Sequence, residues 1–434
     1  MQQEIILITF TTAYRKGGAK FKRVAQTMEK SFTDDDPVYL KEVNSKEALK
    51  AVLNEIIAQG NVIKAFHFIG HSGMYGPMFG TVSFPEQFSP HEIKLLEIPF
   101  LKDAKAYFHC CRSARWFAPF FAREKGVTTY GYHWYTTFSA SKVYFKVDKS
   151  TNGDAPLYCF GCPGLKSHGI FTSAKKYLGK VLAEELKEFL AADNIIDKSY
   201  NKVAEKYAEV FSDIRVRKDE YQWIMEHLPK TEGLRVLDIG CGNGALLRQL
   251  SPKIEQGIGV DVSSSLLALA KSTNSSLQNL NFKLIEGPDL PFEENQFDVV
   301  ISMLSFRYLD WDPIMTEISK VLKEDGKLLV IDMVTTKVKT REYPKLLWDK
   351  VRQYVARFQH ADFYKKLQDM VNTKAWKQML KYNPIRSEHE MKWYLESRFP
   401  GRKVEIINIG MHSRIIAFDS VNMKEVKNLK LSYP

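Results

Sequence analysis

A glycine-rich run that directly follows an apolar stretch carries the most informative chemistry of this sequence. Residues 236–244 read VLDIGCGNG, which predicts a buried strand that ends in a tight turn. Glycine is needed where the backbone must approach a ligand or adopt a positive φ, because a Cβ would oppose both. Asp261 ends the next strand-like run, where its carboxylate can accept two hydrogen bonds from ribose hydroxyls. The pattern therefore indicates a site for a nucleoside cofactor.

Three further segments follow this run in a fixed order. They read EGPDLPF at 286–292, FDVVIS at 297–302 and KVLKEDG at 320–326. The whole series resembles the class I S-adenosylmethionine-dependent methyltransferases, which carry a motif I, a D-A-x-x-L-P-F element, an F-D-V-V strand and an R-V-L-K-P-G-G turn in this order. Two departures concern Glu286, which replaces the aspartate on the adenine side, and Glu324-Asp325, which replace the Pro-Gly pair.

The resemblance implies a Rossmann-like fold and S-adenosylmethionine as the cofactor. It also implies methyl transfer to an oxygen or nitrogen atom of a small acceptor, a reaction that depends mainly on positioning the acceptor in line with the S–CH3 bond. Motif I would hold the amino-acid end and the ribose, and Glu286 with Gly287 the adenine edge. The cofactor-binding positions carried over are Asp238, Gly240, Cys241, Gly242, Gly244, Asp261, Val262, Glu286, Gly287 and Ser302.

Arginine stands at the predicted acceptor end, where related sequences often have a histidine. Arg307 lies in the run SMLSFRYLDW at 302–311. Because arginine stays charged it is a poor base, but it binds carboxylate or phosphate through a two-point fork. We therefore expect an acidic acceptor group near Arg307. A catalytic base would come from elsewhere, with Tyr308 and His360 as candidates. The alternative for His360 is a position on a helix surface without a chemical role, which is more common for a histidine.

A histidine and a cysteine end two neighbouring strand-like runs in the first part of the chain. His71 follows FHFI at 66–69, and Cys111 follows YFHC at 107–110. At the carboxyl ends of adjacent parallel strands they can face each other, which suits a thiol attacking a carbonyl while imidazole moves the proton. Residues 1 to about 175 resemble caspase-like peptidases of the CHAT type. That resemblance implies Cys111 as nucleophile, His71 as base and the backbone around His71 and Gly73 as oxyanion donors; a non-catalytic binding module is the alternative.

The elements that must position these residues alternate between strands and helices. Strands are expected at 4–10, 65–69, 106–110 and 128–132, with helices at 45–59 and 114–125 between them. This alternation predicts an α/β fold with a mostly parallel sheet. In the second half a fifth strand at 327–333 and a last strand pair at 404–409 and 414–419 complete the sheet.

The length of 434 residues predicts two domains, since one hydrophobic core rarely extends so far. We expect a caspase-like domain at 1–178, a linker helix at 179–198, and a methyltransferase domain at 199–434. Tyr200–Tyr207 resembles the family's Y-x-x-x-A-x-x-Y lead-in. An aromatic-rich helical insertion at about 336–402 would cover the carboxyl ends of the strands as a substrate cap; a plain helical subdomain or a dimer interface is the alternative.

Charge is unevenly distributed along the chain. The net charge is +8 for residues 1–178, −7 for 179–330 and +10 for 331–434. The basic parts could hold an acidic or carrier-bound acceptor, or nucleic acid, or could be a solvated surface. No apolar run is long enough to span a membrane and no signal segment is evident, so we expect a cytoplasmic protein with no membrane partner. Cys159 and Cys162 form one C-x-x-C, which with His168 is too little for zinc, so no metal is expected.

Three functions follow from these patterns. The first is a methyltransferase with an appended caspase-like domain that acts as a cysteine peptidase or binds a peptide. The second is a caspase-like cysteine peptidase regulated by a domain that senses S-adenosylmethionine. The third is a non-catalytic two-domain scaffold. The intact motif I favours the first.

Overall fold

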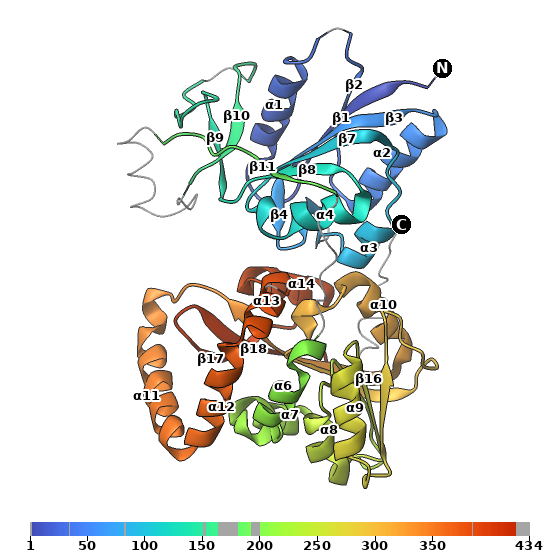
Figure 1. The fold of residues 1–434 in the computed structure, drawn as a ribbon, viewed down its shortest axis with the longest axis vertical. Helices are drawn as coiled ribbons and strands as arrows, with labels where there is room; N and C mark the ends of the chain where they lie inside the picture. Colours follow the sequence, from blue (N-terminus) through green and yellow to red (C-terminus); the bar gives the residue numbers. More distant parts are fainter. Residues whose placement is uncertain are drawn as a thin grey trace. The chain divides into compact units, whose positions relative to one another are not determined.

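The computed structural model describes residues 2–33, 35–81, 84–150, 153–163, 181–191, 200–383 and 385–421. The chain divides into two compact units, Met1–Ile196 and Asp197–Pro434 (Figure 1). Both units combine sheets with covering helices, which confirms the predicted α/β class. Within the described residues, no helix combines the length and the apolar character needed to cross a membrane.

The N-terminal unit is built on a six-stranded sheet in the order β11-β8-β7-β3-β1-β2. Its central strands are apolar runs that are buried on both faces, as a parallel sheet between helices requires. All neighbouring strands are parallel except β11, which is antiparallel to β8. The strands are β1 (Glu4–Phe10), β2 (Val38–Glu42), β3 (Val62–Ile69), β7 (Phe100–His109), β8 (Thr128–Gly131) and β11 (Lys187–Phe189).

Helices and two small antiparallel sheets complete this unit. The helix starts are set by capping: Ser45 accepts a hydrogen bond from the Ala48 N–H, and Ser89 forms a capping box with Glu92. The helices are α1 (Gly18–Glu29), α2 (Lys46–Ala58), α3 (Pro90–Leu95) and α4 (Phe117–Lys125). The small sheets contain β4 (His71–Gly73), β5 (Gly76–Gly80) and β6 (Pro85–Glu86), and β9 (Thr136–Ser139) with β10 (Tyr158–Gly161).

The predicted linker helix is wrong over its described residues, 181–191. This segment is extended, and β11 within it pairs with β8 at Lys187↔Gly131 and Phe189↔Thr129. The apolar spacing suggested a helix, but β8 is otherwise an edge strand whose backbone groups gain partners from the added strand, and such tertiary pairing outweighs local propensity. Residues 179–180 and 192–198 lie outside the described residues.

The C-terminal unit contains a seven-stranded sheet in the order β14-β13-β12-β15-β16-β18-β17. The first five strands are parallel, and the last two form an antiparallel pair beside β16. The direction in which strands are added reverses at β12, and open α/β sheets bind ligands at the carboxyl end of such a strand. The strands are β12 (Arg235–Ile239), β13 (Gln256–Asp261), β14 (Leu280–Leu284), β15 (Phe297–Met303), β16 (Leu322–Thr335), β17 (Glu405–Ile409) and β18 (Ser413–Asp419).

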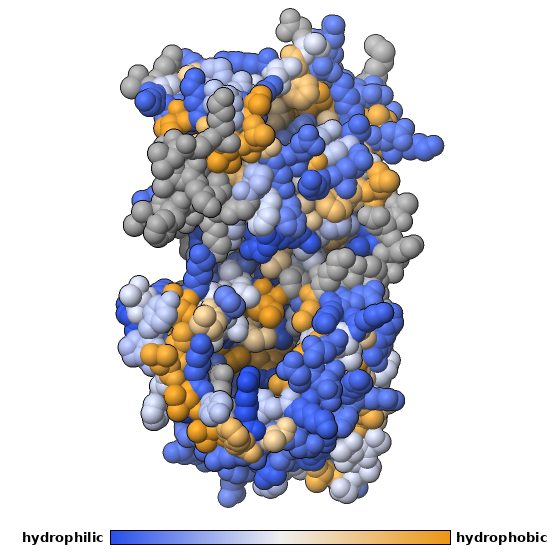
Figure 2. Space-filling view, turned by 60° about the vertical axis from the view of Figure 1, so that its left-hand side comes forward, coloured by the Kyte–Doolittle hydropathy of each residue, from blue (hydrophilic) through white to orange (hydrophobic). Residues whose placement is uncertain are grey.

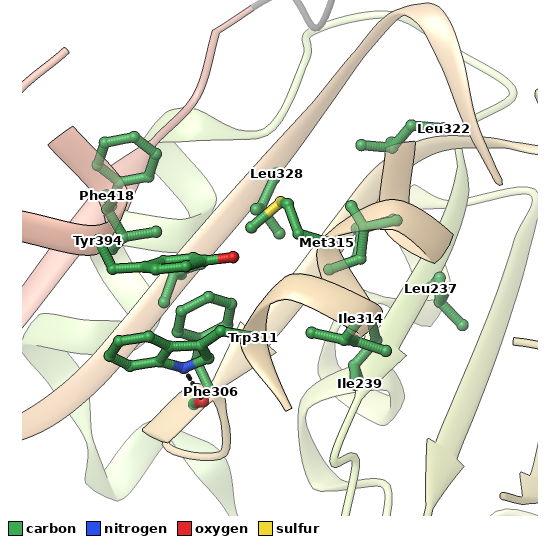
Figure 3. Packing of buried hydrophobic residues seen from close by; sticks show 14 of the residues in the cluster. Leu237, Ile239, Phe306, Trp311, Ile314, Met315, Leu322, Leu328, Tyr394 and Phe418 are labelled. Carbon is green, nitrogen blue, oxygen red and sulfur yellow. Dashed lines mark hydrogen bonds between the residues drawn. The ribbon is translucent and has the colours of Figure 1, made fainter. Parts of the chain in front are cut away.

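The main core of this unit fixes the end of β12. Figure 3 shows Leu237 and Ile239 of β12 packed near Ile314 and Met315, while Phe306, Trp311 and Tyr394 lie together further along the sheet. The Trp311 Nε1–H donates to the Phe306 carbonyl oxygen at 2.9 Å, so the buried indole is satisfied. The helices around this sheet are α6 (Ala204–Val210), α7 (Lys218–His227), α8 (Ala245–Leu250), α9 (Ser264–Thr273) and α10 (Trp311–Val321).

Between β16 and β17, the described residues form four α-helices. They are α11 (Tyr343–Gln359), α12 (Ala361–Val371), α13 (Lys374–Tyr382) and α14 (Glu388–Arg398). Helix α14 belongs to the main core through Met391, Tyr394 and Leu395. Helices α12 and α13 pack with α6 in a separate apolar cluster, whereas α11 forms an outer edge of the unit (Figure 1). The region predicted as a helical insertion therefore contributes α14 to the main core, α12 and α13 to the cluster with α6, and α11 to the outer edge; its role as a substrate cap stays a prediction.

Candidate functional site

The glycine run forms a left-handed turn at the carboxyl end of β12. Gly240, Gly242 and Gly244 have φ values of 76°, 55° and 73°, and α8 begins directly afterwards. A Cβ on Gly240 would lie 2.3 Å from Cβ of Ser305, and one on Gly244 would lie 2.7 Å from the Phe282 ring. Both the backbone conformation and the close approach therefore require glycine.

Backbone hydrogen bonds and Asp261 fix this turn against β13. The N–H groups of Gly240 and Cys241 donate to the Val260 carbonyl oxygen at 2.8 and 3.1 Å. The Asp261 carboxylate accepts from the N–H of Gly242 at 2.9 Å and of Ser263 at 2.8 Å. A carboxylate offers about four acceptor positions, so these bonds orient Asp261 and leave capacity for ribose hydroxyls.

A second carboxylate lies behind the turn. Asp238 is 2% exposed in β12, and burial, followed by the charge of Asp261, raises the pKa of Asp238 to about 7. Burial also raises the pKa of Asp261. Two desolvated acids near each other favour a positively charged ligand, because a cation stabilises both ionised forms.

The other predicted cofactor residues near the turn differ in their exposure and in their hydrogen bonds. Val262 is 54% exposed beside Asp261, whereas Cys241 is buried, which raises the pKa of its thiol. Ser302 is fully buried, and its hydroxyl pairs with Ser305 Oγ at 2.8 Å; Ser305 in turn donates to the Ile239 carbonyl oxygen at 2.6 Å. Ser302 therefore braces the turn.

The adenine-side residues follow β14. Glu286 is exposed, and a Cβ on Gly287 would meet no atom within 4 Å. Direct cofactor contacts of these predicted residues remain a prediction.

An aromatic cluster lies beside the glycine turn. Its members are Tyr200, Tyr207, Tyr308 and Trp376, from the lead-in segment, the β15–α10 connection and α13. Tyr200 lies 5.5 Å from the ring of Tyr207 and 6.1 Å from that of Trp376, and its hydroxyl donates to the Tyr308 hydroxyl at 3.3 Å. The Tyr207 ring would be 3.4 Å from a Cβ on Gly242. The cluster therefore joins α13 to the turn.

Arg307 lies next to this cluster but is already paired. Its guanidinium binds the Asp332 carboxylate, and its backbone N–H donates to the same carboxylate at 2.6 Å. Arg307 is 6% exposed and Asp332 is fully buried, so their charges compensate each other inside the unit. Acceptor binding by Arg307 stays a prediction. Tyr308 belongs to the cluster, whereas His360 is exposed between α11 and α12.

Two polar residues that sequence reasoning missed also shape the site. The Asn201 side-chain oxygen accepts from the Ser263 hydroxyl at 2.8 Å and from the Ser265 N–H at 3.2 Å, so the lead-in segment holds the start of α9 beyond Asp261. Asp332 compensates Arg307. A signal for Asp332 existed, because it is a lone acid inside the apolar run 328–334, which indicates a buried partner.

In the N-terminal unit, the strand register gives His71 and Cys111 matching positions. Ile69 of β3 pairs with His109 of β7, so each predicted residue lies two positions beyond this pair. The Ser72 hydroxyl donates to the Cys111 carbonyl oxygen, which links the two segments directly. Cys111 Sγ lies 3.2 Å from Thr136 Oγ1.

The neighbouring groups show how this site is arranged. His71 Nε2 lies 3.0 Å from the Lys16 carbonyl oxygen. Cys110 points into the core, as strand alternation predicts, and burial raises the pKa of its thiol. Among the described residues, no group of three or more His, Cys, Asp or Glu side chains is placed to hold a metal; His168 lies outside them.

Comparison with known families concerns the second unit. Residues 237–330 match the family described as a methyltransferase domain. This segment is a class I methyltransferase domain. The prediction of a methyltransferase domain from motif I is thus confirmed for this region, and so is the prediction of S-adenosylmethionine as the cofactor. The match does not include the N-terminal unit, where the caspase-like resemblance stays a prediction.

Curated relatives share part of their length with this chain. An uncharacterized methyltransferase, YcgJ of Bacillus subtilis, is 32% identical over 101 residues, or 23% of this chain and 40% of that protein. Demethylmenaquinone methyltransferase of Tropheryma whipplei is 29% identical over 141 residues, which cover 32% and 58%. Sterol 4-C-methyltransferase strm-1 of Caenorhabditis elegans is 30% identical over 126 residues, covering 28% and 36%. The chain thus spans less than two thirds of each.

Solved structures give distant likenesses. A SAM-dependent methyltransferase from Aquifex aeolicus has 18% identity and a TM-score of 0.34, covering 52% of this chain and 100% of that chain. Phosphoethanolamine N-methyltransferase 1 of Haemonchus contortus, in complex with phosphoethanolamine and S-adenosylhomocysteine, has 18% identity and a TM-score of 0.29, covering 32% of each.

Proposed function

We propose that this chain is an S-adenosylmethionine-dependent methyltransferase that acts on an oxygen or nitrogen atom of a small acceptor. The observation that carries the proposal is the left-handed glycine turn at Gly240–Gly244, bonded to Asp261 at the strand where the sheet order reverses. A Cβ on Gly240 would meet Ser305 at 2.3 Å and one on Gly244 the Phe282 ring at 2.7 Å, so a larger residue would displace the turn from the conformation in which its backbone can approach a nucleoside. The Asp261 carboxylate and the backbone of the turn both fit this cofactor.

The residues of the site bind and orient the reactants. When bound, S-adenosylmethionine supplies an electrophilic methyl group. The Asp261 carboxylate, oriented by the N–H groups of Gly242 and Ser263, would accept hydrogen bonds from the ribose hydroxyls. The glycine turn would allow the backbone to approach the ligand. The rings of Tyr200, Tyr207 and Trp376 keep water from the acceptor side, which favours transfer by alignment and desolvation.

For the acceptor we propose a neutral, flat and largely apolar compound. The Asp332 carboxylate compensates Arg307, and the surrounding surface is aromatic. Relatives named for demethylmenaquinone and sterol 4-C methylation support ring compounds as the acceptor class, not the choice of oxygen or nitrogen as the methylated atom. An acidic acceptor, as Arg307 alone suggested, would have to compete with Asp332 for the guanidinium, which makes it the weaker proposal.

Transfer of a labelled methyl group from S-adenosylmethionine tests this function. The acceptor panel contains a naphthoquinol, a sterol, a short carboxylate and a phosphate monoester. The proposal expects incorporation of label into a ring compound. This incorporation should fall in Gly242→Val, because a φ of 55° is strained for valine and the Cβ would lie only 3.4 Å from the Tyr207 ring. Absence of S-adenosylmethionine binding would refute the function, whereas binding with transfer only to the carboxylate would refute the acceptor class.

As a second function we propose thiol chemistry in the N-terminal unit, supported by the matching positions of His71 and Cys111. His71 would take the proton of the Cys111 thiol, and the thiolate so formed would attack a peptide carbonyl carbon, with the carbonyl electron pair moving onto oxygen. A peptide-based electrophile should label Cys111 and lose most of this labelling in His71→Ala, while the buried Cys110 stays unlabelled. Equal labelling in His71→Ala would exclude the pair and leave a binding module.

A further inference from the structure

Helix α11 exposes a continuous apolar face. Among its described side chains, seven large apolar ones are exposed by 47% to 69%. At 3.6 residues per turn they all fall within an arc of about 140° on one side of the helix. They are Tyr343, Leu347, Trp348, Val351, Tyr354, Val355 and Phe358. Figure 2 turns this side of the C-terminal unit toward the viewer and shows hydrophobic side chains gathered there.

Contacts on the opposite side of α11 hold this face outward. Leu346 is 2% exposed, and the Asp349 carboxylate accepts from the Ile409 N–H of β17 at 3.1 Å. Arg352 binds the Asp219 carboxylate of α7 at 2.8 and 3.0 Å. The helix is therefore attached to the unit through Leu346, Asp349 and Arg352, while its wide apolar face is exposed, the reverse of the usual arrangement for a surface helix.

Basic residues border the apolar face. On the helical wheel Lys350 and Arg357 lie along one edge, and Lys345 and Arg352 along the other. The one acid of the helix, Asp349, is on the buried side. An apolar face with Trp, Tyr, Phe and Leu between two basic edges is typical of helices that lie in the interface of a membrane, with the cations near lipid head groups.

We propose that α11 docks the protein on the surface of a bilayer that contains anionic lipid. The apolar face enters the boundary between head groups and acyl chains, and Lys350 and Arg357 contact lipid phosphates. Arg352 stays bound to Asp219, and Lys345 to the Ile406 carbonyl oxygen. A second copy of the chain fits less well, since like charges would meet. One helix face about 26 Å long and 10 Å wide also offers only on the order of 300 Å² per partner, less than a stable dimer needs. This proposal does not depend on methyl transfer.

Co-sedimentation of the full chain with vesicles tests the proposal. Vesicles of phosphatidylcholine with about 30% phosphatidylglycerol should bind the wild type, whereas pure phosphatidylcholine should bind it much less. Raising the salt from about 0.1 to 0.5 M should weaken binding. Trp348→Ala with Phe358→Ala should lower vesicle affinity at least about tenfold. Leu95→Ala, which removes a comparably exposed apolar side chain from α3, is the matched control and should bind like the wild type.

Three results would overturn the proposal. The wild type could fail to bind anionic vesicles, or the double variant could bind them as tightly as the wild type. A dimer in light scattering that the double variant converts to monomer, without vesicle binding, would assign the face to a second copy. Unchanged affinity of the double variant for S-adenosylmethionine shows that the unit is folded. Charge reversal by Lys350→Glu with Arg357→Glu should abolish the preference for anionic vesicles while the apolar face is intact.

Discussion

The affinity for S-adenosylmethionine should depend on pH through Asp238. Burial and the charge of Asp261 raise the pKa of Asp238 to about 7, so this acid becomes protonated as the pH falls through neutrality. A cationic ligand prefers the ionised carboxylate. If only that form supports binding, the dissociation constant should be about eightfold higher at pH 6 than at pH 7.5, or about 1.2 kcal/mol.

Stability without ligand should change in the opposite direction. Because the folded-state pKa lies above the ordinary value, the native protein binds more protons between about pH 4 and pH 7, and its free energy of unfolding decreases as the pH rises through that window. Binding of the cationic cofactor should offset this decrease in the free energy of unfolding.

Isothermal titration at several pH values measures the effect. The variant Asp238→Asn keeps the shape of the side chain and removes its titration. Any pH dependence of the dissociation constant that remains in this variant belongs to the ligand or to other groups. A change of less than twofold in the wild type, or the same slope in Asp238→Asn, would refute the reasoning.

Two further substitutions have defined outcomes. Gly240→Ala should lower cofactor affinity at least about tenfold, because its Cβ would meet Ser305 at 2.3 Å; Gly401→Ala, with a φ of 82° and open space, is a control for the backbone strain alone and should bind normally by titration. Asp332→Ala should lower the free energy of unfolding by about 3–5 kcal/mol in urea, since it leaves Arg307 buried and uncompensated. If the free energy of unfolding of Asp332→Ala is nearly the same as that of the wild type, water or another acid compensates the charge of Arg307.

The glycine turn could be predicted because its requirement is local. A run of glycines after an apolar strand specifies positive φ angles within a few residues, and Gly240, Gly242 and Gly244 adopt them. The alternation of strands and helices was equally visible, so β1 is found at the predicted residues and β3, β7 and β8 overlap the predicted strands.

Features that depend on distant partners could not be predicted. The pairing of Arg307 with Asp332 joins the connection after β15 to β16 across 25 positions, and sequence spacing does not report such a contact. The strand β11 was mistaken for a helix because its structure depends on the free edge of β8. For α11, periodicity reveals two faces, but only the contact of Asp349 with β17 shows which one turns outward.

Calorimetric titration of Asp261→Ala with S-adenosylmethionine tests the central claim most directly. Loss of the two proposed hydrogen bonds from the ribose hydroxyls to the Asp261 carboxylate should weaken binding of the cofactor by roughly tenfold to a hundredfold. Asp325→Ala is the matched control, because it removes an exposed carboxylate near the amino end of β16, at the opposite edge of the sheet. The proposed cofactor site predicts a large loss for Asp261→Ala and none for Asp325→Ala. Equal affinity of Asp261→Ala and the wild type would contradict it.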